Sequence, residues 1–336
     1  MKTHVVARSL VAALLLCGGV AQAQDKTNYL LFVRNDGIGA VGYMDRSGQF
    51  TQTQAFGEGS FAPDWSRVVS AENGVLFYRA DGLAAVGRID RNGQFTTTWS
   101  GGFSPNWTHI VRSGHDILFV RADGLGAVGH IDRNGVFVQT QSFAVGSFAA
   151  NWSQVVSTDN GILFYRTDGL GAVGRIDASG HFTTTYSSAA FATNWSQIVS
   201  TGKDLLFYRA DGLAAVGRID SAGRFVTTQS FPPGSFAANW SDIVPTGRNV
   251  FFYRQSDGIA AVGQIDENGQ FTTVQSYDVS AFPDYWTTIV DTGNDLLLYA
   301  ADGTVEEAYL DRDGSLVSTV VSVFSDNWTH IVKVSQ

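Results

Sequence analysis

The sequence predicts an all-β, seven-bladed β-propeller of four-stranded blades, with one blade built from strands at both ends of the chain. Two observations predict this fold. Three sequence markers recur together seven times at steps of 42 to 46 residues, and the segments between them alternate in polarity with a period of two. A repeat of about 45 residues with room for four short strands is the size of a propeller blade.

The three markers are an Asp-Gly pair, an aspartate in an apolar-Asp-x-x-Gly motif, and a tryptophan that opens each copy. The Asp-Gly pairs begin at Asp36, Asp81, Asp123, Asp168, Asp211, Asp257 and Asp302. The second aspartates are Asp45, Asp90, Asp132, Asp177, Asp220, Asp266 and Asp311. The tryptophans are Trp65, Trp107, Trp152, Trp195, Trp240, Trp286 and Trp328. Seven copies in one phase indicate seven equivalent structural units.

The first 23 residues have the pattern of a secretory signal peptide. Lys2 and Arg8 precede a short apolar run, and Ala21-Gln22-Ala23 matches a small-x-small cleavage site before Gln24. The run is too short to span a bilayer. We therefore expect a secreted or periplasmic protein without membrane insertion, whose residues 24–336 form a single propeller domain.

Removal of this segment leaves no cysteine, so a mature chain of this kind has neither disulfides nor thiol chemistry. The net charge falls from −9 to −11, because Lys2 and Arg8 are lost and no acid is. Such an acidic balance argues against nucleic acid or an anionic membrane as a partner.

Four strands fit into each copy. In the copy that opens at Trp152, we expect strands ending at Val156 and covering 162–166, 172–177 and 181–186. The Asp-Gly pair predicts a hairpin between the second and third strands. The Asp-x-x-Gly motif predicts a type I turn between the third and fourth. All fourteen marker aspartates are thus explained as turn residues that cap their own backbone.

The phrase Leu-Phe-Tyr-Arg-x-Asp-Gly, followed by two small residues and Val-Gly, forms the central hairpin of a copy. If residues 80–83 are its turn, Arg79 lies opposite Ala84, and Tyr78 opposite Ala85. Large side chains then lie beside a shelf of small ones. Such a shelf admits either a bulky residue of the neighbouring blade or a ligand ring, and we favour packing at most of these positions.

The two ends of the chain complement each other. The first expected strand after the signal segment, residues 29–34, is the second strand of a copy, and the stretch from Trp328 to Val334 is a first strand. One blade would then join both termini and close the ring, which leaves no long exposed sheet edges.

Two recurring side chains are candidates for ligand binding. A tryptophan flanked by short polar residues can stack on a sugar, although a buried packing role is the stronger interpretation. An arginine ends the second strand of six copies and is Ala300 in the last; its donors suit hydroxyl pairs and carboxylates, and pairing with an acid of its own blade is equally compatible. The candidate residues are Arg34, Arg79, Arg121, Arg166, Arg209, Arg254, Trp65, Trp107, Trp152, Trp195, Trp240 and Trp286.

No catalytic or metal-binding pattern stands out from the repeat. The histidines of the mature chain have no common phase, and neither a GxSxG nor an HExxH motif is present. A pair of glycosidase carboxylates would be a unique feature, yet no acid departs clearly from the repeat. We therefore expect a protein that is not an enzyme and has no cofactor or metal ion. The histidines are His109, His115, His130, His181 and His330.

The order Trp-x-x-Ile/Val, Leu-Phe-Tyr-Arg-x-Asp-Gly and Gly-x-Ile-Asp-x-x-Gly-x-Phe resembles the blade of tachylectin-2-like and tectonin-type β-propellers, over all seven copies from Tyr29 to Val334. The resemblance implies a lectin with equivalent sugar sites between or on the blades, commonly for N-acetylated hexoses on cell surfaces. The best-known member of that family has fewer blades. The last copy lacks both the small shelf and the arginine, so a site that needs them would occur six times or fewer.

A second function class stays open. A propeller can instead be a non-enzymatic scaffold that presents one face to a protein partner. This alternative predicts a single-copy apolar patch on the loops, for example at Phe231-Pro232-Pro233 or at Phe282-Pro283-Asp284-Tyr285.

Overall fold

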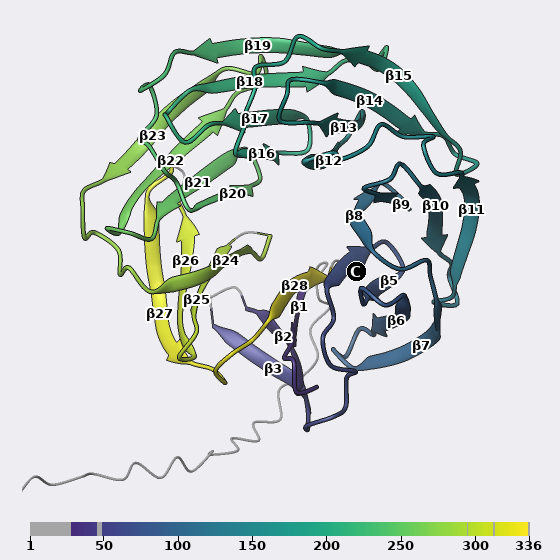
Figure 1. Cartoon of the computed structure of the whole chain (residues 1–336). Helices are drawn as coiled ribbons and strands as arrows, with labels where there is room; N and C mark the ends of the chain where they lie inside the picture. The colour runs from purple at the N-terminus through teal and green to yellow at the C-terminus, as the bar shows by residue number, and fades with distance from the viewer. Residues whose placement is uncertain (1–27, 46–48, 294, 312, 335–336) are drawn as a thin grey trace, which may run out of the picture.

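Seven four-stranded antiparallel sheets are arranged in a ring in the computed structural model of the chain (Figure 1). The structure describes residues 28–45, 49–293, 295–311 and 313–334, and the expected signal segment 1–23 lies outside them. The predicted seven-bladed, four-stranded, all-β fold is confirmed. None of the described residues lies in a helix that is long and apolar enough to cross a membrane.

We number the blades 1 to 7 along the chain. Blade 1 contains β28 (His330–Val334), β1 (Tyr29–Val33), β2 (Gly39–Met44) and β3 (Phe50–Phe56). Blade 2 contains β4 (Arg67–Ala71), β5 (Gly74–Tyr78), β6 (Leu83–Ile89) and β7 (Phe95–Gly102). Blade 3 contains β8 (Trp107–Ser113), β9 (Asp116–Arg121), β10 (Gly126–Ile131) and β11 (Phe137–Phe143). Blade 4 contains β12 (Gln154–Thr158), β13 (Gly161–Tyr165), β14 (Gly171–Ile176) and β15 (Phe182–Ser188).

The remaining three blades follow in the same order. Blade 5 contains β16 (Gln197–Ser200), β17 (Asp204–Tyr208), β18 (Ala214–Ile219) and β19 (Phe225–Phe231). Blade 6 contains β20 (Asp242–Thr246), β21 (Asn249–Arg254), β22 (Ile259–Ile265) and β23 (Phe271–Tyr277). Blade 7 contains β24 (Trp286–Asp291), β25 (Asp295–Ala300), β26 (Thr304–Leu310) and β27 (Leu316–Val323). In blade 4, the expected strands match those of the structure to within a few residues.

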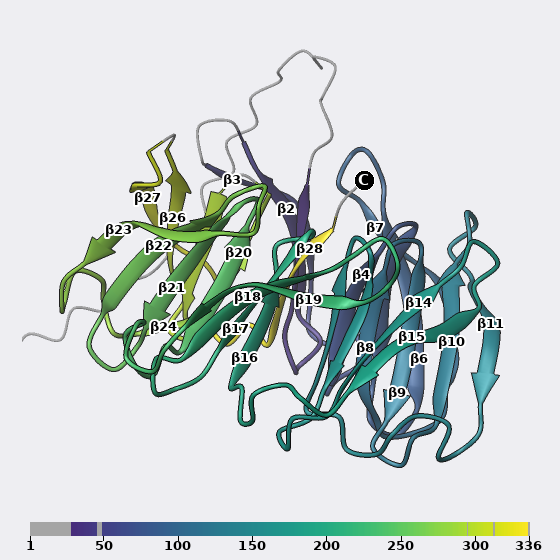
Figure 2. The same cartoon turned by 90° about the horizontal axis from the view of Figure 1, so that it is seen from above.

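The ring closes as predicted. β28 pairs antiparallel with β1, with Tyr29 opposite Val334 and Val33 opposite His330, so the two ends of the described chain share one sheet. The first strands of neighbouring blades contact one another around the ring and form its inner layer. The fourth strands lie on the outside of the ring (Figure 1), and Figure 2 shows the same blades from above.

The predicted register of the central hairpin is wrong by one residue. Tyr78 lies opposite Ala84 and Phe77 opposite Ala85. The Arg79 amide donates to the Leu83 carbonyl, which leaves three residues in the loop instead of two. The third of them, Gly82, has a φ of 99°, a left-handed conformation that a three-residue hairpin loop places at this position. The Asp81 carboxylate accepts a hydrogen bond from the Leu83 amide, as expected of a turn aspartate.

The core lies between the blades. Each core cluster combines residues of two adjacent sheets; one of them includes Leu163 and Tyr165 of blade 4 with Ile198 and Phe207 of blade 5. The second-strand residues Leu163, Tyr165 and Phe207 are almost fully buried. The apolar second strands thus supply both faces of every junction, which explains why the phrase Leu-Phe-Tyr recurs.

Two kinds of polar contact link neighbouring blades at most junctions; blades 1 and 3 have Val33 and Val120 in place of the tyrosine, and blade 6 has Val274 in place of the threonine. The second-strand tyrosine donates to a carbonyl in the loop that leads into the following blade; Tyr208, for example, donates to Ala237 at 2.9 Å. A fourth-strand threonine donates to the carbonyl of a turn glycine in the following blade, as Thr228 does to Gly269 at 2.7 Å. Because each contact satisfies a polar group that packing would otherwise leave unpaired, the repeat stabilises a single angle between blades.

Candidate functional site: pockets between the blades

The tryptophans are held by backbone geometry as well as by packing. Asn194, which precedes Trp195, has a φ of 62°, a left-handed conformation that asparagine tolerates well. The Trp195 amide donates to the Tyr165 hydroxyl of the preceding blade at 3.1 Å. The indole then lies on Phe207, with ring centroids 5.6 Å apart. The Asn-Trp pair therefore recurs for a structural reason: the asparagine adopts the left-handed conformation that places the tryptophan in the core.

All six candidate tryptophans are buried, with exposed fractions between 2 % and 8 %. In five of them the indole Nε1 is buried and has no hydrogen-bond partner among the described residues; these are Trp65, Trp107, Trp152, Trp240 and Trp286. Packing is therefore a role of every one of these residues, as the sequence analysis favours. A buried donor without an acceptor is unusual in proteins.

The six candidate arginines each bind the aspartate of their own Asp-Gly turn, which is the structural pairing that the sequence analysis left open. The nitrogen–oxygen distances are 2.7 to 2.8 Å in five pairs, and the Arg34–Asp36 pair is closer still. The arginine side chain holds the pKa of Asp81, Asp123, Asp168 and Asp211 at about 2. A second contact ties several of them to the loop before the tryptophan; Arg254, for example, donates to the Ala238 carbonyl at 2.7 Å.

Two equivalent pockets open between blades on the outer part of the ring. One has a volume of about 280 Å³ and lies between blades 4 and 5; the other, of about 250 Å³, lies between blades 5 and 6. Trp195 lines the first and Trp240 the second. None of the six candidate arginines is among the residues that line them. The structure therefore brings the tryptophan, but not the arginine, to a concave surface.

Eight side chains occupy matching positions in the two pockets. In the first they are Trp195, Phe207, Ala215, Phe225, Thr227, Ser230, Phe191 and Ala192. In the second they are Trp240, Phe252, Ala261, Phe271, Thr273, Ser276, Phe236 and Ala237. The small-residue shelf is thus partly open to the pocket, with aromatic rings beneath it and exposed threonine and serine hydroxyls of the fourth strand at the rim.

The same eight residue types recur at two further junctions in the sequence. Blade 2 has Trp65, Phe77, Ala85, Phe95, Thr97, Ser100, Phe61 and Ala62. Blade 4 has Trp152, Phe164, Ala172, Phe182, Thr184, Ser187, Phe148 and Ala149. Blade 3 differs at Gln139 and Ser104, blade 1 at Gln52 and Ala55, among other positions. Blade 7 replaces the shelf alanine by Glu306. The complete set is therefore present in blades 2, 4, 5 and 6.

Two features of the pocket were missed by the sequence analysis. One is a phenylalanine four residues before every tryptophan, such as Phe191 before Trp195, and the other is the serine near the end of the fourth strand. The Phe-x-x-x-Trp spacing holds in all seven copies, so it was a usable signal. The serine recurs in phase in five copies, but the sequence does not show that it faces a pocket, because that depends on the tilt of one blade against the next.

The chemistry of the pocket is that of a binding site with an apolar floor and a polar rim. The rings of Phe191 and Phe225 lie tilted against each other with centroids 4.9 Å apart. The Phe225 ring also fills the space above Gly217, where a β-carbon would lie 2.4 Å from it. The glycine of the Val-Gly pair is therefore required for the aromatic floor. Sites of this composition hold a ligand by burying its apolar surface and orient it with a few hydroxyl groups.

Comparisons with known proteins show the fold and no family. No family profile matches the sequence. No curated protein matches it either. A putative 6-phosphogluconolactonase from Bacteroides fragilis has a similar structure, with 14% identity, a TM-score of 0.64, and coverage of 94% of this chain and 100% of that one.

Two other solved structures are similar. A protein from Lactobacillus plantarum has a TM-score of 0.65 at 13% identity, with coverage of 92% of this chain and 100% of its own. Sqt1 from Chaetomium thermophilum, solved bound to the N-terminus of the ribosomal protein L10, has a TM-score of 0.54 at 14% identity, with coverage of 90% and 88%. Similarity at such low identity establishes a propeller fold alone.

Proposed function

We propose that this protein is a multivalent carbohydrate-binding protein whose sugar sites are the pockets between blades. The observation that carries the proposal is the repetition of eight matching side chains in the two pockets. A pocket of about 250 Å³ fits one or two sugar rings, which present an apolar face to the aromatic floor and hydroxyl groups to the rim.

The four blades with the complete residue set are the proposed sites. Weak sites on one rigid ring reach useful strength by simultaneous binding to a polyvalent glycan. The resemblance to tachylectin-2-like and tectonin-type propellers supports N-acetylated hexoses as ligands. We further propose that the protein is secreted or periplasmic, acts without catalysis, and meets its glycans on cell surfaces.

Filling the shelf tests the proposal. Replacing Ala85, Ala172, Ala215 and Ala261 together by leucine puts a larger side chain into every complete pocket. We expect circular dichroism to stay that of the wild type, while binding to an array of N-acetylated glycans falls at least tenfold. Since Arg209 does not line a pocket, Arg209→Ala is the matched control and keeps full binding. No saturable binding by the wild type at millimolar sugar, or equal binding by the quadruple variant, refutes the proposal.

A protein-binding scaffold is the second candidate, and blade 7 supplies the observation that favours it. Val321 and Val323 of the outer strand β27 are 66 % and 73 % exposed, and Tyr285, directly before β24 of the same blade, is 47 % exposed. Of the two patches expected from sequence, Phe231 and Phe282 instead pack against the core. Under this alternative, Val321→Ser with Val323→Ser abolishes partner binding, and the shelf variant does not.

A further inference from the structure

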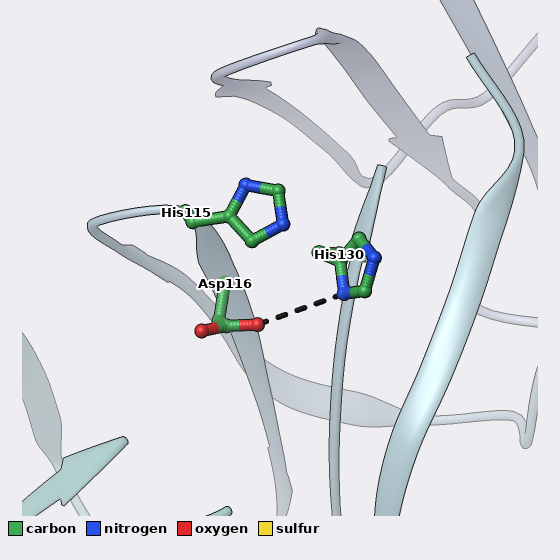
Figure 3. A group of neighbouring side chains, drawn as sticks. All are labelled: His115, Asp116 and His130. Carbon is green, nitrogen blue, oxygen red and sulfur yellow. Dashed lines mark ion pairs between the residues drawn. The ribbon is translucent and has the colours of Figure 1, made fainter. Parts of the chain in front are cut away.

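Three side chains capable of binding a metal ion meet at one end of blade 3 (Figure 3). His115 and Asp116 lie where the hairpin between β8 and β9 enters β9, and His130 lies on β10 directly opposite Asp116. One ligand atom from each of the three lies within 4.8 Å of the others. His115 is exposed and Asp116 is buried, with 7 % of its surface exposed.

The cluster departs from the repeat. At the matching positions of blade 5, Asp204 is also buried, and Arg218 donates to it through Nε at 2.8 Å. In blade 3 His130 replaces that arginine, and its Nδ1 is 3.8 Å from the Asp116 carboxylate. This distance is too long for a hydrogen bond. The arrangement in blade 5 already satisfies the fold, so the imidazole is not needed for packing.

Glu72 of blade 2 fixes the orientation of His115. Its Oε2 lies 2.9 Å from His115 Nδ1, which leaves Nε2 for the cluster, and Figure 3 shows the ring turned with that edge toward His130. A carboxylate on the outer nitrogen of an imidazole is a common second contact in metal sites, because it sets the tautomer and the ring orientation. Three ligands and a positioning residue thus come from two blades.

The cluster borders an open hollow. His115 and Asp116 line a polar concavity of about 860 Å³ that extends to Asn160 of blade 4 and Ser221 of blade 5. A metal ion held by three protein ligands would therefore keep a coordination position facing solvent. This is the arrangement of open zinc sites, in contrast to closed structural ones.

We propose that His115, Asp116 and His130 bind one divalent transition-metal ion, with Zn²⁺ as the best fit, and that Glu72 positions His115. Two imidazoles and one carboxylate are a common zinc ligand set, whereas Ca²⁺ and Mg²⁺ require oxygen ligands. Ligands about 2.1 Å from a tetrahedral ion lie roughly 3.4 Å apart. The ligand atoms now lie within 4.8 Å of one another, and side-chain rotations that move them by about 1 Å bring them to that spacing.

Calorimetry with Zn²⁺ on untagged protein, previously dialysed against a chelator, tests the site. We expect one Zn²⁺ per chain. Because His130→Arg reproduces the Asp204–Arg218 pair of blade 5, it keeps the fold and weakens Zn²⁺ binding at least 100-fold. His115→Ala has a similar effect. Glu72→Gln weakens binding about tenfold, as expected for a second contact.

The exposed His181 of blade 4 provides the matched control. Its Nδ1 also lies 3.8 Å from an aspartate, Asp177, but it has no second histidine beside it in the described structure, so His181→Ala leaves Zn²⁺ binding unchanged. Absence of stoichiometric binding by the wild type, or equal binding by His130→Arg, overturns the proposal. Glycan binding is measured separately in chelator, because the sugar pockets share no residue with the cluster.

Discussion

Blades 5 and 7 have the same sheet and differ at several of the positions that repeat. Blade 5 keeps the arginine Arg209, the shelf residue Ala215 and the rim residue Ser230. The corresponding residues of blade 7 are Ala300, Glu306 and Val321. Both blades nevertheless form four antiparallel strands in the same order. The fold therefore requires none of these three residues.

What blade 7 retains shows what the fold does require. Trp286 is only 2 % exposed, and Tyr299 still donates to the Ser325 carbonyl and accepts from the Trp328 amide. The turn aspartates Asp302 and Asp311 also remain, and each accepts a hydrogen bond from the backbone. The tryptophan and the turn aspartates, which all seven blades share, thus build the ring, and the tyrosine adds its hydrogen bonds in five blades, being Val33 and Val120 in blades 1 and 3.

Loss of a tryptophan is the largest effect we expect in either blade. Trp240→Ala and Trp286→Ala each remove a buried indole, and both should lower the free energy of unfolding by about 3–5 kcal/mol. Urea unfolding measures this loss, with far-UV circular dichroism as the signal because it does not depend on tryptophan fluorescence. A loss below about 1 kcal/mol for Trp286→Ala alone would show that blade 7 does not rely on the shared framework.

The next largest effect concerns the pH dependence of stability, which we expect from Glu307, a buried acid in blade 7. Glu307 replaces the valine found at this position in blades 1 to 6, and only 1 % of it is exposed. Burial raises its pKa to about 7, although a hydrogen bond from the Phe50 amide acts in the opposite direction. In blades 1, 3 and 5 the corresponding acceptor for the next blade is a glutamine of the fourth strand, such as Gln229 for Phe271. Glu307 thus supplies that acceptor from the neighbouring strand.

This acid predicts a pH dependence of stability. Between pH 4.5 and 7 the folded protein holds the proton of Glu307 more tightly than the unfolded chain, so its contribution to stability is present below pH 4.5 and is lost as the pH rises through 7. Glu307→Gln removes this dependence. At pH 8 the variant should be more stable by up to about 3 kcal/mol, and at pH 4 the two proteins should be equal. Thermal unfolding across this range measures the difference, and parallel profiles would contradict it.

The smallest effect on stability is expected from the Arg209–Asp211 pair of blade 5, which blade 7 lacks. Arg209→Ala should raise the pKa of Asp211 from about 2 toward its ordinary value, because the arginine hydrogen bond is the main cause of the lowering. Ala300→Arg is the reverse experiment: it should lower further the pKa of Asp302, which a hydrogen bond from the Thr304 amide already lowers. Carboxyl titrations by NMR measure both. The low pKa of Asp211 contributes stability above about pH 4, but both side chains are at least partly exposed to solvent, which screens the pair, so Arg209→Ala should change global stability at neutral pH little.

Much of the candidate site could be read from local patterns. The seven tryptophans, the small shelf and the Phe-x-x-x-Trp spacing are all periodic features, and a periodic feature in one chain indicates one environment repeated. The register of the central hairpin could not be read in the same way. A two-residue and a three-residue loop share the Asp-Gly pair, and the structure selects the longer loop with Gly82 in the left-handed conformation.

The histidine cluster shows a different limit. His115 and His130 have no common phase in the repeat, so their spacing in the sequence gave no reason to pair them. They meet because the hairpin of β9 and β10 places position 130 opposite position 116. Whether a residue that departs from the repeat is isolated or part of a cluster depends on strand pairing.

By itself, the sequence determined the number of blades, their four-strand composition, the closure of the ring by both termini and the chemistry of the turns. The strands and turns follow from local preferences within one repeat, and the number of blades and the closure follow from the periodicity of the whole sequence and the phase of its two ends. Only the tertiary structure decided that Arg209 is bound to its own turn, that Trp195 forms a pocket wall as well as a core contact, and that two histidines face one buried aspartate. Each of these depends on how one strand or blade is set against another, and that geometry comes from the whole ring.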